Sequence, residues 1–124
     1  MPRDFDLSKI SGLDFEKGLE VFEDDMEDYT AALKSFVKNT PDTINKLRGV
    51  TEDKLPEYAI NIHGLKSVSS WICAQGIMEG AAELDALAKT SDFSAIAAKN
   101  DMFLDEADAF INNLKTLLDN YTKD

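Results

Sequence analysis

The chain has 124 residues, 13 of them basic and 24 acidic, which gives a formal net charge of −11. This length suits one domain with one hydrophobic core, so we expect residues 1–124 to form a single domain, and a hydrophobic content of 44% favours a globular chain over a disordered one. The negative charge argues against nucleic acid and against anionic membrane surfaces as partners, because both would repel the protein.

The single cysteine, Cys73, excludes an internal disulfide bond and suits a reducing compartment. The first residues lack the apolar stretch of a signal peptide, and no apolar run approaches the roughly 20 residues that cross a bilayer. We therefore expect a cytoplasmic protein with no membrane partner.

Apolar residues recur every three to four positions, which is the helical period, and no stretch alternates with the period of a strand. The pattern predicts a short helix at about 14–22 with Asp14 as its N-cap. A second helix is expected from about Asp25. The pair Thr40-Pro41 either kinks this helix or ends it, and Gly49 marks the next stop.

The rest of the chain predicts a long third helix, a fourth helix, a short helical piece and a long last helix. Their expected ranges are 53–74, 77–89, 93–98 and 101–121. Gln75-Gly76 is expected to end the third helix, and Asp92 to cap the short piece. Amphipathic helices joined by short turns favour an all-α fold, here an antiparallel four-helix bundle with one or two short extra helices.

The third helix carries the only histidine of the chain, His63. At about 100° per residue, five residues of this helix, four of them apolar and one a serine, share one side that should face the core. They are Tyr58, Ile62, Leu65, Ser69 and Ile72. His63 points away from that side, toward solvent, and Lys66 follows one turn later, from where it can reach the imidazole.

Mostly small side chains surround His63 on this outer side, where another protein could come close to the imidazole. Ile60 and Trp71, two apolar residues expected to point outward, would add apolar contact area for that protein. The expected partner-binding residues are Ala59, Ile60, Ser67, Ser70, Trp71 and Ala74.

These residue types suit a carrier of phosphoryl groups. Imidazole is a competent nucleophile near neutral pH because its ordinary pKa is about 6.5. A phosphoryl group on the ring would carry a charge of about −2, which Lys66 would offset. A lone histidine on a helix surface is more often an ordinary surface residue, so this geometry does not by itself establish a function.

Other residues of chemical interest have simpler interpretations. Cys73 is expected to be a buried packing residue. Acidic residues of the later helices are expected on solvated faces, and aromatic residues of the last helix in the core. The acids are Glu83, Asp85, Asp105 and Glu106, and the aromatic residues are Phe103, Phe110 and Tyr121.

The segment from His63 to Ala74 reads HGLKSVSSWICA. It resembles the signature of histidine-containing phosphotransfer (HPt) domains, in which the phosphorylated histidine is followed by any residue, Leu, Lys, Gly, a run of small residues and an Ile-Gly-Ala-like step. The matching positions are Leu65, Lys66, Ile72 and Ala74. Ser67 and Cys73 stand where the family usually has glycine, and Trp71 is bulkier than the residues usual there.

The similarity extends over about residues 10–121. On the C-terminal side the matching positions are Ile77, Ala81, Leu84-Asp85, Ala88-Lys89 and Asp92. On the N-terminal side they are Ile10-Ser11-Gly12-Leu13-Asp14, Gly18-Leu19, Phe22, Tyr29, Leu33, Phe36 and Pro41. The resemblance therefore implies an HPt-type bundle.

The resemblance also implies a function, that of a phosphoprotein of a two-component phosphorelay. A response-regulator receiver domain would pass a phosphoryl group from its aspartate to His63, which would pass it on to another receiver. Lys66 would balance the charge of the phosphohistidine, and the partner receiver would supply Mg²⁺. A hybrid sensor histidine kinase is a further expected partner, and the protein is expected to be a monomer.

The chain contains no glycine-rich phosphate loop and no Walker motif. We therefore expect no nucleotide site, no bound cofactor or metal, and no catalytic centre of its own. An alternative is an interaction-only helical module that binds a receiver or another partner without phosphotransfer, which Ser67 and Trp71 leave open. A zinc or hydrolytic enzyme is disfavoured, because one histidine without a second histidine or suitably spaced cysteines is a poor metal site.

Overall fold

The structure, a computed structural model, describes residues 10–122, and their side chains as far as residue 119. Within this range the fold is all-α, with five α-helices, one 3-10 turn and no strand. The elements are α1 (Phe15–Val21), α2 (Met26–Leu47), η2 (Glu52–Lys54), α3 (Leu55–Trp71), α4 (Gln75–Lys89) and α5 (Phe93–Thr122). None of these helices is long and apolar enough to cross a membrane.

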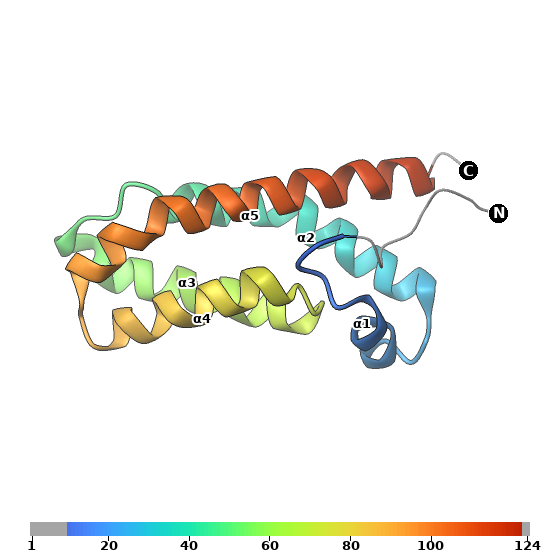
Figure 1. Ribbon diagram of the computed structural model, residues 1–124, viewed down its shortest axis with the longest axis horizontal. Helices are drawn as coiled ribbons and strands as arrows, with labels where there is room; N and C mark the ends of the chain where they lie inside the picture. Colours follow the sequence, from blue (N-terminus) through green and yellow to red (C-terminus); the bar gives the residue numbers. More distant parts are fainter. Residues whose placement is uncertain (1–9, 123–124) are drawn as a thin grey trace.

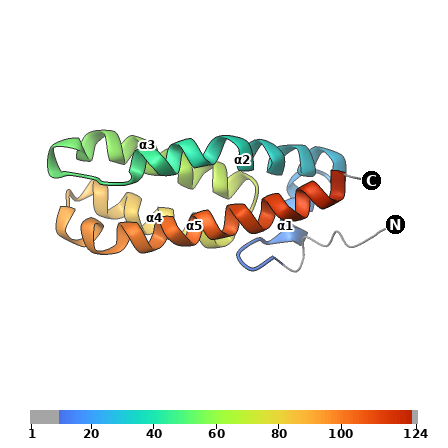
Figure 2. The same cartoon turned by 90° about the horizontal axis from the view of Figure 1, so that it is seen from above.

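The four long helices lie lengthwise beside one another as a helical bundle, and each runs opposite to the one before it (Figure 1, Figure 2). α3 packs against α2 and α4, and α5 packs against the same two helices. α1 contacts α2 and lies at the end of the bundle where α2 begins (Figure 1).

The core fills the space between the four long helices. The largest fully buried side chains are Tyr29, Leu33, Ile44, Leu47, Ile62, Leu65, Ile72, Leu84, Ile96, Leu104 and Leu114. All five residues predicted for the inner side of the third helix are buried, as are Phe103 and Phe110. The prediction for the side chain of Tyr121 lies outside the described residues.

Several predicted helix ends are confirmed. The carboxylate of Asp14 accepts a hydrogen bond from the Lys17 backbone N–H at 3.2 Å and caps α1. α2 begins after Asp25, as predicted, and continues through Pro41 instead of ending there. The third α-helix begins at Leu55, after the 3-10 turn, and not at residue 53.

The predicted end of α3 at Gln75-Gly76 is wrong. α3 ends at Trp71, because Cys73 adopts a left-handed backbone conformation with a φ of 61°, and Gln75 is already the first residue of α4. Gly76 instead permits a close backbone approach. Its N–H donates to the Gly12 carbonyl at 3.0 Å, and a Cβ at position 76 would lie 3.4 Å from the Gly12 Cα.

The two helices predicted at 93–98 and 101–121 are a single uninterrupted helix, α5. The reason is Asn100, which lies at the expected break but is buried. Its amide donates to the Leu47 carbonyl at 2.9 Å and accepts from the Tyr58 hydroxyl at 2.9 Å. Because the core satisfies this polar side chain, Asn100 continues the helix. Asp92 caps its start as expected.

Candidate functional site

His63 lies on the outer side of α3, with 57% of its side chain exposed. Its neighbours on the helix, Ile62 and Leu65, are buried. The predicted orientation of His63 toward solvent is therefore confirmed, and it follows from the helical period once the apolar side of α3 is packed inward.

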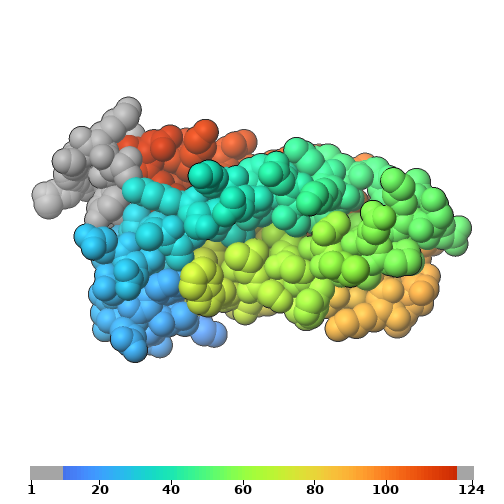
Figure 3. Space-filling view, turned by 180° about the vertical axis from the view of Figure 1, so that it is seen from behind, coloured from blue at the N-terminus to red at the C-terminus, as the bar shows by residue number. Residues whose placement is uncertain are grey.

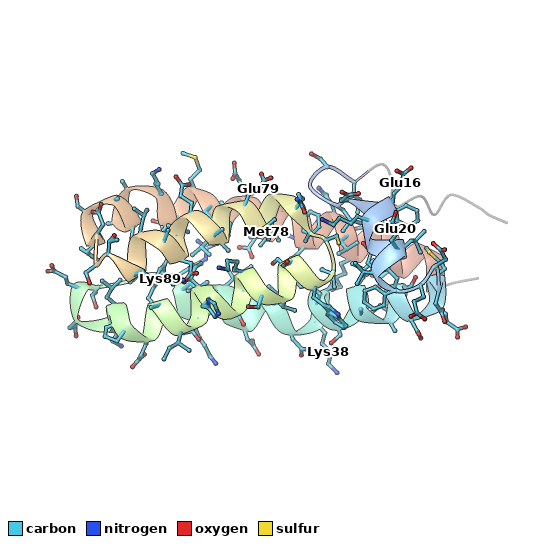
Figure 4. All side chains as sticks on the ribbon, turned by 90° about the horizontal axis from the view of Figure 1, so that it is seen from below. Glu16, Glu20, Lys38, Met78, Glu79 and Lys89 are labelled. Carbon is cyan, nitrogen blue, oxygen red and sulfur yellow. The ribbon has the colours of Figure 1, made fainter. Side chains whose placement is uncertain are left out.

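Asp85 of α4 lies beside His63, and only 4% of its side chain is exposed. Its Oδ2 atom is 3.1 Å from the Lys66 Nζ, 3.4 Å from the Lys89 Nζ and 3.4 Å from the His63 Nδ1. We call these four residues the His63 cluster. Lys89 lies where α4 faces α3 (Figure 4), so the cluster is assembled by the packing of these two helices.

The local sequence places each pair of the cluster. His63 and Lys66 are three positions apart on α3, and Asp85 and Lys89 are four positions apart on α4, so each pair shares one side of its helix. Leu84 is buried in the core, and Asp85 follows it at the edge of that inner face. The packing of α3 against α4 then covers the Asp85 carboxylate.

The prediction that Asp85 lies on a solvated face is therefore wrong. Glu83, two positions earlier, is exposed as predicted and pairs with Lys99 at 2.6 Å. Asp105 and Glu106 are also exposed. The sequence does contain one signal for Asp85, namely its position next to a core leucine and one turn before a lysine, but that signal does not identify the helix that covers it.

The charges of the cluster keep Asp85 ionised. Burial by itself would raise the pKa of the Asp85 carboxyl, but the hydrogen bonds from Lys66, His63 and Lys89 lower it, and the resulting pKa lies below the ordinary value. Lys66 was predicted to reach His63, whereas its hydrogen bond goes to Asp85.

The Asp85 carboxylate also selects the tautomer of His63. An ionised carboxylate can only accept hydrogen bonds, so the His63 Nδ1 must carry the proton of their 3.4 Å contact, which is a long hydrogen bond. In the neutral ring the lone pair is then on Nε2. Within residues 10–122, Nε2 has no hydrogen-bond partner.

The residues predicted to bind a partner lie mostly where expected. Ile60 is 74% exposed and Trp71 53% exposed. Ser67 and Ser70 are exposed, and Ala59 is half-buried. Ala74 is the exception, because it is fully buried. α3 has already ended at this point and the chain turns into the bundle, so Ala74 offers no surface to a partner.

A groove of about 440 Å³ lies between α2 and α3, and its lining includes Gly64, the residue that follows His63. Its lining is Ala32, Ser35, Phe36, Asn39, Thr40, Thr43, Ile60, Asn61, Gly64, Leu65, Val68 and Trp71. No residue of this lining is charged, although charged residues make up 30% of the chain. Figure 3 shows α2 and α3 side by side across this face, with α1 at one end.

Aromatic packing holds Trp71 at the end of the groove nearest α1. Its ring centroid lies 5.1 Å from that of Phe22, and the Phe22 centroid lies 5.2 Å from that of Tyr29. The Tyr29 hydroxyl donates to the Ile72 carbonyl at 2.9 Å. Trp71 is thus a half-exposed apolar residue whose ring packs on Phe22 at the end of α1, and Phe22 packs in turn on Tyr29 of α2.

Cys73 is buried, as predicted, and burial raises the pKa of its thiol, which disfavours the reactive thiolate. Between residues 10 and 122, no three His, Cys, Asp or Glu side chains gather in a way that could hold a metal ion.

The His63 cluster combines an accessible nitrogen nucleophile, a buried carboxylate that orients the ring, and two cations. Such a set can accept a small anionic group on Nε2 and balance its charge. Comparison of the chain with protein-family models, with curated proteins and with solved structures finds no match.

Proposed function

We propose that this chain is a histidine phosphotransfer module of a two-component phosphorelay, with His63 as the residue that carries the phosphoryl group. One observation carries the proposal: His63 faces solvent with its Nδ1 held by a buried carboxylate, which leaves Nε2 free for attack. The resemblance of residues 63–74 to the HPt signature supports the same assignment, and the helical bundle would then be of the HPt type.

In the proposed reaction, a receiver domain brings its phosphoaspartate over His63. The Nε2 lone pair attacks the phosphorus in line, the bond between phosphorus and the aspartate oxygen breaks, and its electron pair stays on the receiver carboxylate. The receiver supplies Mg²⁺ for this step. On this chain, Lys66 and Lys89, the two cations of the His63 cluster, offset the charge that arrives.

The groove between α2 and α3 supplies the docking surface in this proposal. Because its lining carries no charge, a charged segment of the partner would lose hydration there without gaining a counter-charge. The receiver should therefore place an uncharged element into the groove. Ile60 and Trp71 flank it as exposed apolar contacts, and Trp71 is large enough to act as an anchor.

Transfer of label tests the proposal. The protein is incubated with a receiver that carries labelled phosphate on its aspartate. We expect label to move to this chain in an acid-labile, alkali-stable form and to be absent in His63→Gln. Retention of label in His63→Gln would exclude His63 as the acceptor, and incubation with labelled ATP alone should give no label because no nucleotide motif is present.

The uncharged groove also fits a second candidate, an interaction-only module that binds a receiver without phosphotransfer. The two candidates differ in their dependence on the imidazole. Receiver binding that is unchanged in His63→Ala, together with no uptake of label by the wild-type protein, would favour the second candidate. Testing several purified phosphorylated receivers in the same assay identifies the partner.

A further inference from the structure

We infer that the Asp85 carboxylate keeps the Nδ1 proton on the ring of His63 after phosphorylation, so that His63 is a fast phosphoryl donor with a short-lived phosphohistidine. This role rests on the proposed function, because it concerns the phosphorylated ring. This role of Asp85 is more than orienting the imidazole ring, since it depends on the negative charge of Asp85 as well as on its hydrogen bond with the His63 Nδ1.

The geometry fixes Asp85 beside the ring. Its side chain is 4% exposed, whereas Lys66 is 31% and Lys89 is 65% exposed. The two lysines can therefore swing toward solvent and toward an incoming phosphoryl group, but the carboxylate cannot follow them. The contact between Asp85 Oδ2 and His63 Nδ1 is the one that should persist when the site is occupied.

The bonds and protons of the transfer step show why the negative charge of Asp85 matters. Attack by Nε2 forms the bond between nitrogen and phosphorus and leaves the ring with Nδ1–H and a positive charge. Nothing in the step removes that proton. The charged side chains that contact one another around the ring are Lys66 on α3 and Asp85 and Lys89 on α4, and the groove on the α2 side contributes none. Asp85 is the one anion among them.

The same proton controls the outward step. When the next receiver aspartate attacks phosphorus, the bond between Nε2 and phosphorus breaks and its electron pair returns to Nε2. With Nδ1 protonated, the leaving group is a neutral imidazole, and without that proton it is an imidazolate, which leaves far less readily. An adjacent carboxylate stabilises the protonated ring, as the buried aspartate does in the Ser-His-Asp arrangement.

The experiment compares the wild-type protein with Asp85→Asn, which keeps the shape of the side chain and removes its charge. Glu83→Gln is the matched control, because it removes an acid from the same helix that pairs with Lys99 and not with His63. Each protein is phosphorylated by a labelled receiver. The ³¹P signal of the phosphohistidine is then followed against pH, and the rate of transfer to a second receiver is measured. Since His63 is the only histidine, one signal is expected.

In Asp85→Asn, the phosphohistidine signal should titrate at a lower pH than in the wild type. At about pH 8, above the ordinary imidazole range, onward transfer should slow by about tenfold or more and the phosphohistidine should last longer. Glu83→Gln should match the wild type. A titration and a rate that are the same in Asp85→Asn and the wild type would overturn the inference.

A measurement on the wild type alone covers the case in which Asp85→Asn does not fold. At about pH 8 the ¹⁵N spectrum of the phosphorylated ring should show a protonated Nδ1, and a bare Nδ1 would overturn the inference. Failure of the wild type to take up phosphate from any receiver would instead count against the proposed function. The two failures are therefore distinguishable.

Discussion

Replacing Lys66 by methionine tests the energetics of the His63 cluster. Methionine keeps most of the aliphatic stem and removes the ammonium group, so the change isolates the charge. The Lys66 Nζ makes the shortest contact of the cluster with Asp85, at 3.1 Å. Its loss leaves a carboxylate that is 4% exposed with two longer contacts, to Lys89 and to His63, both at 3.4 Å.

The expected cost follows from these distances. A hydrogen bond to a charged group contributes about 1.5–3 kcal/mol, whereas a buried ion stripped of its partner costs about 3–5 kcal/mol. Because Lys89 and His63 remain, we expect Lys66→Met to lower the free energy of unfolding by about 1.5–3 kcal/mol. At about 4 °C per kcal/mol for a chain of this size, the Tm should fall by about 6–12 °C.

The effect should depend on pH. The pKa of Asp85 in the folded protein lies below its ordinary value, which is about 3.9 for an unfolded chain. Asp85 therefore contributes stability that is fully present above about pH 3.9 and is lost as the pH falls through the folded value. Lys66→Met raises the folded pKa, so the difference between variant and wild type should be largest near neutral pH and should shrink in acid.

Urea unfolding followed by the fluorescence of Trp71, the only tryptophan, gives the free energies at about pH 7 and about pH 3. Lys99→Met is the control, because its partner Glu83 is 57% exposed, and such a pair contributes about 0–1 kcal/mol. A cost for Lys66→Met that equals the cost for Lys99→Met, or that does not change with pH, would refute this account of the cluster.

Trp71→Ala should weaken receiver binding by about fivefold or more in titration calorimetry, because it removes the largest apolar contact of the groove. Met102→Ala is the control, since it changes another exposed apolar residue and should leave binding unchanged. Equal affinities for the two variants would remove Trp71 from the docking surface. Gly80→Ala should destabilise the fold by about 1–3 kcal/mol, because its Cβ would lie 2.4 Å from the Phe103 ring. Gly64→Ala, with nothing within 4 Å of its Cβ, should stabilise α3 by about 0.5–1 kcal/mol in the same unfolding experiment, and a loss of stability in Gly64→Ala would contradict this explanation.

The sequence by itself determined the local features of this protein. The helical content, the caps at Asp14 and Asp92, and the two sides of α3 all follow from interactions within a few residues, so the 3.6-residue period and capping preferences were sufficient to predict them. The exposure of His63 belongs to this class, because it is fixed by the position of the apolar residues on its own helix.

Only the tertiary structure decided what surrounds His63. Asp85 is 22 positions away in the sequence and joins the site because α4 packs against α3, and that packing also converts a carboxylate expected in water into a buried one. Ala74 and the break expected between residues 98 and 101 were mispredicted for the same reason, since the turn after α3 and the core around Asn100 are built from contacts between helices. A helical period tells which side a residue faces, but a neighbouring helix decides whether that side is covered.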